Sequence, residues 1–172
     1  QPTPIGAHAE RLGMEAKRIP SVNCEEFRAE LLAMQPDVLL VMAFGQILRP
    51  EILAIPRVTC LNVHASILPR HRGASPINAA IISGDEETGV SFMQMDVGLD
   101  TGPVYRTVKV PIGAEDTAGT LENRLAEAAA GTIEAVLCDI SAGRLTAVPQ
   151  DNKQATYAPK LSKQIGLLDW GR

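Results

Sequence analysis

Two apolar segments, each followed by sequence that cannot continue a strand, constrain the fold most strongly. Residues 37–43 are almost continuously apolar, which is typical of a strand buried on both faces of a parallel sheet. Residues 58–64 alternate and are rich in β-branched side chains, and the Pro-, Gly- and Arg-rich residues 66–76 end that strand. Helical patterns flank the strands at residues 23–34, 50–54 and 75–83. The chain is therefore predicted to be an α/β protein with a Rossmann-like, doubly wound, mostly parallel sheet and helices on both faces.

The remaining elements extend the same pattern. Thr3, directly before a proline, is a predicted N-cap for a first helix, and residues 15–19 predict a weak strand. Asn23 is the predicted N-cap of the next helix, because a glutamate follows three residues later. Later in the chain we expect a strand at 88–94, an antiparallel strand with one wet face at 103–110, and a long helix from Asp116 or Thr117 to about Ser141.

Three polar side chains form a candidate catalytic group. Asn62 and His64 are two residues apart on one strand, so both project from the same face at its carboxyl end, where open α/β sheets bind ligands. An amide can donate to a developing oxyanion and an imidazole titrates near neutrality, so the pair suits acyl transfer. Asp100, in the polar loop at 96–102, can orient His64 as the third group of such a constellation. The alternative for each residue alone is a local turn or core role.

The sequence around these residues resembles a known family. The folate-dependent formyltransferases closely resemble this chain at Asn62-Val-His64, at Ser-Ile-Leu-Pro-Arg-His-Arg-Gly (66–73) and at Gln-Met-Asp-Val-Gly-Leu-Asp-Thr-Gly (94–102). Within that family the chain is most similar to members that act on methionyl-tRNA, and the resemblance covers nearly all of it. The resemblance implies the formyltransferase fold and places the family's catalytic Asn, His and Asp on Asn62, His64 and Asp100.

The resemblance also implies 10-formyltetrahydrofolate as the co-substrate, and we expect no metal ion. A loop with free backbone groups and two aliphatic side chains suits a flat, partly apolar cofactor, and glycines let a backbone approach a ligand closely. For Phe44, a glycine-aided turn is the alternative. The residues expected to bind the cofactor are Ser66, Ile67, Leu68, Pro69, Phe44, Gly45, Gly98 and Leu99.

Arg70, Arg72 and Gly73 are the residues expected to bind the substrate. The Arg-His-Arg segment carries the sharpest local positive charge, which can meet a phosphate, the glutamate tail of the cofactor or the end of a tRNA. The alternative is a solvated loop whose arginines pair with neighbouring acids. A net charge of −4 argues against tight nucleic-acid binding by this segment alone. A tRNA substrate therefore requires positive surface from local clusters or from other parts of the protein.

The reaction that the resemblance implies is transfer of a formyl group from 10-formyltetrahydrofolate to the amine of methionyl-initiator-tRNA, for translation initiation. One alternative is a formyltransferase that acts on a small amine, such as a purine ribonucleotide precursor or an amino sugar. Another is a catalytically silent folate-binding module. The segments at 70–72 and 96–102 favour the tRNA substrate by resemblance only.

The chain is predicted to contain a catalytic domain at residues 1–145 and a wrap-around extension at 146–172, which in the family leads towards a C-terminal tRNA-binding domain. The family carries a strand, a helix and a basic loop before this point, so we expect an N-terminal strand-helix unit to be missing here. The three cysteines and three histidines show no metal-ligand spacing, and no apolar run is long enough to span a bilayer. We expect a monomer in the cytoplasm, without a membrane partner.

Overall fold

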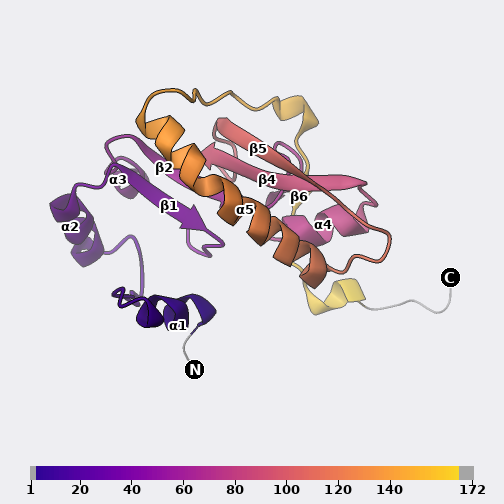
Figure 1. Cartoon of the computed structure of the whole chain (residues 1–172), viewed down its shortest axis with the longest axis horizontal. Coiled ribbons are helices and arrows are strands. Elements are labelled where there is room, and N and C mark those ends of the chain that lie inside the picture. Colours follow the sequence, from indigo (N-terminus) through magenta and orange to yellow (C-terminus); the bar gives the residue numbers. More distant parts are fainter. Residues whose placement is uncertain (1–2, 167–172) are drawn as a thin grey trace.

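The computed structural model describes residues 3–166, which are built around one four-stranded sheet (Figure 1). Its strands lie in the order β1 (Val38–Met42), β2 (Thr59–His64), β4 (Glu87–Gln94) and β5 (Val104–Pro111). β1 and β2 are parallel, whereas β4 is antiparallel to both of its neighbours. The prediction of an antiparallel strand at 103–110 is thereby confirmed.

Most helices begin where the sequence predicts. Thr3 caps the first helix with its side chain, and Thr117 forms a capping box at the start of the longest one. Asn23 is not an N-cap, because Cys24 takes that place and the side chain of Asn23 binds the backbone of the loop before α3. Residues 15–19 form no strand. The α-helices are α1 (Pro4–Arg11), α2 (Glu25–Met34), α3 (Pro50–Leu53), α4 (Pro76–Ile82) and α5 (Ala118–Ser141). Within residues 3–166, none combines the length and the apolar character that a bilayer crossing requires.

The sheet is mixed, which corrects the expectation of a mostly parallel one. Helix α3 lies in the crossover between the parallel strands β1 and β2. Helix α4 instead returns the chain to the end of β2, where His64 pairs with Ser91 of the antiparallel β4. The loop after β4 joins it to β5 as a hairpin. Only antiparallel strands can be joined by so short a connection. The α/β class and the Rossmann-like arrangement, with helices on both faces, are confirmed.

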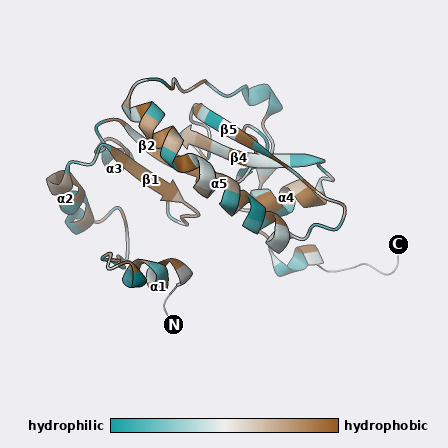
Figure 2. Ribbon diagram, viewed as in Figure 1, coloured by the Kyte–Doolittle hydropathy of each residue, from teal (hydrophilic) through white to brown (hydrophobic). Residues whose placement is uncertain are grey.

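An apolar core lies on each face of the sheet. One core lies between the sheet and helices α4 and α5, and it takes Leu61 and Val63 from β2. The other lies towards α2 and α3 and takes Cys60 from the same strand. Figure 2 shows β1 hydrophobic along its length and α5 divided between polar and apolar residues, as expected for a helix with one buried side. The alternation along β2 turns Asn62 and His64 to the same face as Cys60, away from α5.

The segment after α5 returns across the molecule. Val148 forms a bridge with Val104 of β5, and the short 3₁₀ helix η1 (Asn152–Gln154) follows. The two-residue strands β3 (Arg72–Gly73) and β6 (Tyr157–Ala158) pair in parallel, and the 3₁₀ helix η2 (Lys163–Gly166) comes last. The domain boundary at 145/146 stays a prediction, and residues 167–172 of the predicted extension lie outside the described residues.

Burial distinguishes the thiols of Cys60 and Cys138, which gives a first testable prediction. Cys60 is 3% exposed on β2, and burial raises the pKa of its thiol to about 11. The thiolate is the reactive form, so Cys60 should resist alkylation at neutral pH. Cys138 is exposed on α5 and should react readily. Mass spectrometry of peptides after iodoacetamide treatment measures both. Equal labelling of the two cysteines in the folded protein would contradict the buried position of Cys60.

Candidate active site

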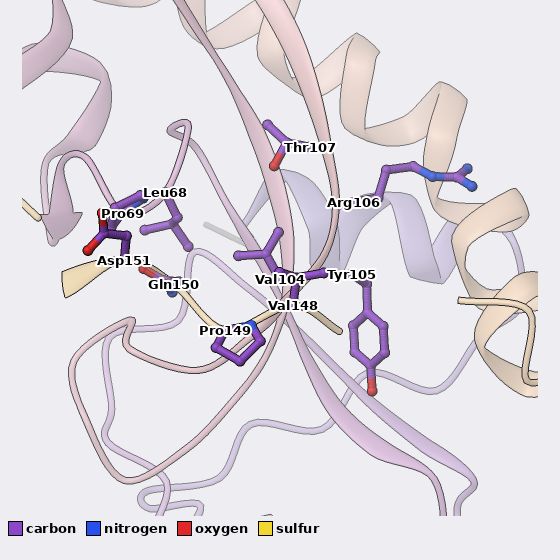
Figure 3. A pocket seen from close by; sticks show the side chains of 10 residues that line it. All are labelled: Leu68, Pro69, Val104, Tyr105, Arg106, Thr107, Val148, Pro149, Gln150 and Asp151. Carbon is purple, nitrogen blue, oxygen red and sulfur yellow. The ribbon is translucent and has the colours of Figure 1, made fainter. Parts of the chain in front are cut away.

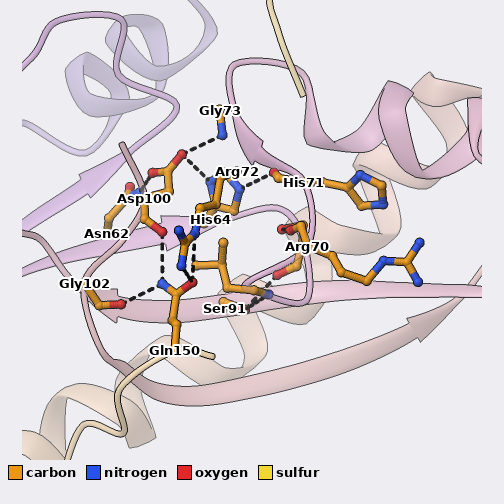
Figure 4. A network of polar contacts seen from close by, with 12 residues as sticks. Asn62, His64, Arg70, His71, Arg72, Gly73, Ser91, Asp100, Gly102 and Gln150 are labelled. Carbon is orange, nitrogen blue, oxygen red and sulfur yellow. Dashed lines mark hydrogen bonds and ion pairs between the residues drawn. The ribbon is translucent and has the colours of Figure 1, made fainter. Parts of the chain in front are cut away.

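The three predicted catalytic side chains come together beside β2 (Figure 4). Asn62 and His64 stand on the same face of that strand, and Asp100 arrives from the loop between β4 and β5. Nδ2 of Asn62 lies 3.5 Å from Oδ1 of Asp100. Nδ1 of His64 lies 3.7 Å from Oδ2 of the same carboxylate. The structure therefore brings the group together in space, and the role of each residue stays a prediction.

The ring of His64 is held through its other nitrogen. Nε2 of His64 lies 2.9 Å from the backbone carbonyl oxygen of His71. A carbonyl oxygen only accepts hydrogen bonds, so Nε2 carries a hydrogen and the lone pair of the neutral ring is on Nδ1. The residue is only 6% exposed, which restricts movement of the ring. The lone pair on Nδ1 therefore faces Asp100.

A backbone donor holds the carboxylate of Asp100. Its Oδ2 accepts a 2.8 Å hydrogen bond from the backbone N–H of Gly73. Gly73 has a φ of 114°, and an added Cβ would lie 2.7 Å from the carbonyl oxygen of Ala158, so no other residue fits there without strain. The side chain of Asp100 is 15% exposed. The carboxylate is thus anchored at one oxygen and still partly open to solvent.

The group has the donors and the acceptor that acyl transfer needs. The distances from Asn62 and His64 to Asp100 exceed those of strong hydrogen bonds. The polar atoms of all three side chains therefore remain available to a substrate. Nδ2 of Asn62 and a protonated Nδ1 of His64 can donate to an oxyanion, while the carboxylate can accept a proton from a nucleophile. Such contacts often shorten once a substrate is bound.

The loop after β2, expected to bind the cofactor, makes several hydrogen bonds within the protein. Two of its backbone groups are occupied, because the hydroxyl of Ser91 donates to the carbonyl of Ser66 and accepts from the N–H of Leu68. Ser66 is 0% exposed, and its own hydroxyl donates to another carbonyl of the loop. A cofactor cannot reach that side chain, and the assignment of Ser66 to cofactor binding stays a prediction. Ile67 and Pro69 remain partly exposed, whereas Leu68 is 8% exposed.

Four other predicted cofactor residues lie in exposed loops. Phe44, two residues after the end of β1, is 45% exposed, and Leu99, beside Asp100, is 60% exposed. Gly45 has open space around it, whereas an added Cβ at Gly98 would lie 1.9 Å from Oγ1 of a neighbouring threonine, which would have to move. The two large apolar side chains are available to a flat ligand, and their assignment to the cofactor stays a prediction.

The three predicted substrate residues do not form one cationic patch. Arg70 is exposed, but its guanidinium pairs with Asp85 and points away from the catalytic group in Figure 4. Arg72 is 2% exposed and donates to side-chain oxygens of the segment after α5. The structure thus contradicts the expected contact between Arg72 and a substrate, because its guanidinium is buried and already bound. The N–H of Gly73 donates a hydrogen bond to the carboxylate of Asp100.

A surface pocket of about 310 Å³ is lined by the loop after β2, by β5 and by the segment after α5 (Figure 3). It is formed by Leu68 and Pro69, by residues 104–107 of β5 and by residues 148–151. No member of the catalytic group lines it, although Gln150 does and also contacts the backbone of Asp100. In the described part of the chain, no cluster of three or more His, Cys, Asp or Glu side chains is arranged to hold a metal ion.

Two parts of this site were not predicted from the sequence. Gln150 donates hydrogen bonds to the carbonyl oxygens of Asp100 and Gly102. It is one polar residue in a segment without periodicity, so no pattern singles it out. The second part is the backbone carbonyl of His71, which fixes the ring of His64. Backbone groups carry no sequence signal, so this contact becomes visible only in the fold.

Comparison with known proteins agrees with this chemistry. The family described as formyl transferase matches residues 8–137 of the chain. The phosphoribosylglycinamide formyltransferase of Streptococcus pneumoniae TIGR4 is 27% identical and has a TM-score of 0.70, with 80% of this chain and 80% of its own covered. HypX from Aquifex aeolicus, in complex with tetrahydrofolic acid, is 21% identical with a TM-score of 0.70, over 83% of this chain and 24% of its own. This second likeness shows the fold alone.

Two relatives are more similar in sequence. The methionyl-tRNA formyltransferase of Halothermothrix orenii is 44% identical over 172 residues, which are 100% of this chain and 54% of the relative. That of Aromatoleum aromaticum is 48% identical over 169 residues, 98% of this chain and 54% of the relative. The chain thus spans about half the length of the curated relatives it matches. Because the family match contains all three members of the catalytic group, the site and the comparisons agree that this chain belongs to the formyl transferase family.

Proposed function

We propose that the protein transfers a formyl group from 10-formyltetrahydrofolate to the amine of methionine carried by initiator tRNA, in translation initiation. The observation that carries the proposal is the convergence of Asn62, His64 and Asp100 in a member of the formyl transferase family. Relatives that are 44% and 48% identical are named methionyl-tRNA formyltransferases. These names favour tRNA over a small amine, and formyl transfer over a silent folate-binding module.

Each of the three side chains has a distinct part in the proposed reaction. The methionine nitrogen attacks the formyl carbon, forming a new C–N bond while the carbonyl electron pair moves to oxygen. Asn62 and the protonated Nδ1 of His64 donate hydrogen bonds to that oxyanion. Asp100 accepts the proton of the attacking amine and returns it through water to N10 of the folate. The oxyanion then re-forms the carbonyl as the bond to N10 breaks, so tetrahydrofolate leaves with the proton.

Folate contacts are proposed at the exposed apolar side chains of Phe44 and Leu99, since a flat ring system with apolar faces suits such surfaces. The tetrahydrofolic acid complex of HypX, a protein of the same fold, supports a folate ligand. Phosphates of the tRNA need other partners, because Arg70 is paired with Asp85 and Arg72 is buried. The proposal places the protein in the cytoplasm, where tRNA is charged, as a monomer.

The reaction can be tested directly with the protein at its full natural length. Incubation with 10-formyltetrahydrofolate and initiator methionyl-tRNA should give formylmethionyl-tRNA, with tetrahydrofolate released in equal amount. Acid gel electrophoresis measures the first product and absorbance the second. Glycinamide ribonucleotide and an amino-sugar nucleotide are matched acceptors, and neither should become formylated.

Two results would contradict this proposal, each in its own way. Formylation of a small amine without formylation of the tRNA would assign the protein to the other substrate class. Calorimetric binding of a folate analogue without transfer to any acceptor would support a silent folate-binding module.

A further inference from the structure

Asp100 can serve His64 only while the loop between β4 and β5 keeps one conformation. Asp100 itself has a φ of 52°, in the left-handed region, which aspartate adopts more readily than most residues but less easily than glycine. Its neighbours Val97 and Leu99 are 75% and 60% exposed, so little apolar packing restrains the loop on its outer side. Hydrogen bonds must therefore hold the loop, and within it the carboxylate of Asp96 binds the N–H of Gly98 and the hydroxyl of Thr101.

The backbone at Asp100 itself is held by Gln150, far along the chain (Figure 4). Nε2 of Gln150 donates to the carbonyl oxygen of Asp100 at 2.9 Å and to that of Gly102 at 2.6 Å. The two carbonyls flank Thr101, so one amide group fixes the backbone on both sides of it. This is the part of the loop that determines where the Asp100 side chain points.

A buried arginine fixes the orientation of that amide. Nε and Nη2 of Arg72 lie 3.1 and 2.7 Å from Oε1 of Gln150, and Nη2 also donates to Oδ1 of Asn152 at 2.8 Å. A guanidinium has donors only, so it must face the oxygen of the amide. Nε2 is thereby directed at the Asp100 loop. The 2% exposure of Arg72 protects this arrangement from competing water.

The opposite end of Asp100 is held from the residue next to Arg72. The N–H of Gly73 binds the carboxylate, and Gly73 is fixed in turn by the pairing of β3 with β6. The backbone of Asp100 is thus held by Gln150 and its carboxylate by Gly73. Both contacts depend on β3, because Arg72 orients Gln150 and Gly73 donates to the carboxylate.

We propose that Gln150, oriented by Arg72, is a positioning residue that aims the Asp100 carboxylate at Nδ1 of His64. The inference rests on the proposed formyl transfer for its effect on rate. It makes no claim that Gln150 touches either substrate. The contribution of Gln150 therefore passes entirely through Asp100.

The substitution Gln150→Glu tests the amide donor separately from the amide oxygen. A glutamate keeps an oxygen for Arg72 but replaces the donor with a second oxygen, which faces the carbonyls of Asp100 and Gly102. In the protein at full natural length we expect kcat to fall by about 10²-fold, because small misplacements of a catalytic group cost that much. KM for each substrate should stay within about threefold, since binding contacts are unchanged. Gln154→Glu is the matched control, as Gln154 is exposed on η1 and binds only Asp151 nearby. It should leave kcat unchanged.

Two further measurements make the test independent of folding and of the assigned reaction. In an Asp100→Asn background, Gln150→Glu should lower kcat less than about twofold further, because its effect passes through Asp100. Hydrogen exchange of the Gly73 N–H, followed by NMR, should lose protection in Gln150→Glu and keep it in Gln154→Glu. Full loss of rate in both backgrounds, or unchanged protection at Gly73, would overturn the positioning role. Absence of formyl transfer by the unmodified protein would instead refute the proposed function, and the exchange result would still decide whether Gln150 holds Asp100.

Discussion

Replacing His64 by alanine is expected to lower kcat for formyl transfer by about 10²–10³-fold, the range seen when an oxyanion donor is lost. The ring is 6% exposed, and the carbonyl of His71 holds its Nε2, which leaves Nδ1 facing Asp100. Alanine removes the donor to the developing oxyanion and the partner of the carboxylate together. KM for the tRNA should change little, because the ring acts on the reacting atoms. Steady-state kinetics with the protein at full natural length give both constants.

His8→Ala is the matched control, since His8 is exposed on α1 and its ring lies against Arg11. Its activity should stay within about twofold of the unmodified protein, as for most surface substitutions. Asn62→Ala should resemble His64→Ala, and the double substitution should cost less than the product of the two, because the residues act as one unit. A folded His64→Ala protein whose kcat stays within about tenfold would show that His64 does not stabilise the oxyanion.

Much of the candidate site could be predicted because its signal is local. The alternation along β2 fixes which residues share a face, so Asn62 and His64 had to stand side by side once the strand was correct. The polar loop at 96–102 placed Asp100 near a strand end in the same way. The family resemblance supplied what spacing could not, namely that three residues distant in sequence belong to one group, and the distances of 3.5 and 3.7 Å agree with it.

What could not be predicted depends on contacts between distant segments. The residues of β4 would suit a parallel or an antiparallel strand, and its direction is decided by where α4 returns the chain. From the sequence, Arg72 is expected to be a surface cation in a polar loop. It is buried instead, because Gln150 and Asn152, 78 and 80 positions away, supply oxygens to its guanidinium. The carbonyl of Ser66 is occupied for the same kind of reason, because the hydroxyl of Ser91, on the distant strand β4, donates to it.

Replacing Phe92 by alanine should lower the free energy of unfolding by about 3–5 kcal/mol while leaving kcat of the folded protein unchanged. Phe92 is 0% exposed on β4 and lies in the core under α5. Its neighbours Ser91 and Met93 project from the opposite face, where they pair with His64 and Asn62. The cavity left by the substitution therefore opens on the helix side, away from the catalytic group. Urea unfolding measures the stability, and kinetics well below the melting temperature measure the rate.

Phe44→Ala removes the same atoms from a side chain that is 45% exposed, and it should cost under about 1 kcal/mol of stability. It should instead raise KM for the folate, because Phe44 is proposed to contact it. A Phe92→Ala protein that loses less than about 1 kcal/mol, or whose kcat falls while it remains folded, would show that the two faces of the sheet are not independent. We expect independence because the side-chain period of two places core residues and site residues alternately on one backbone, so a change on one face need not move the other.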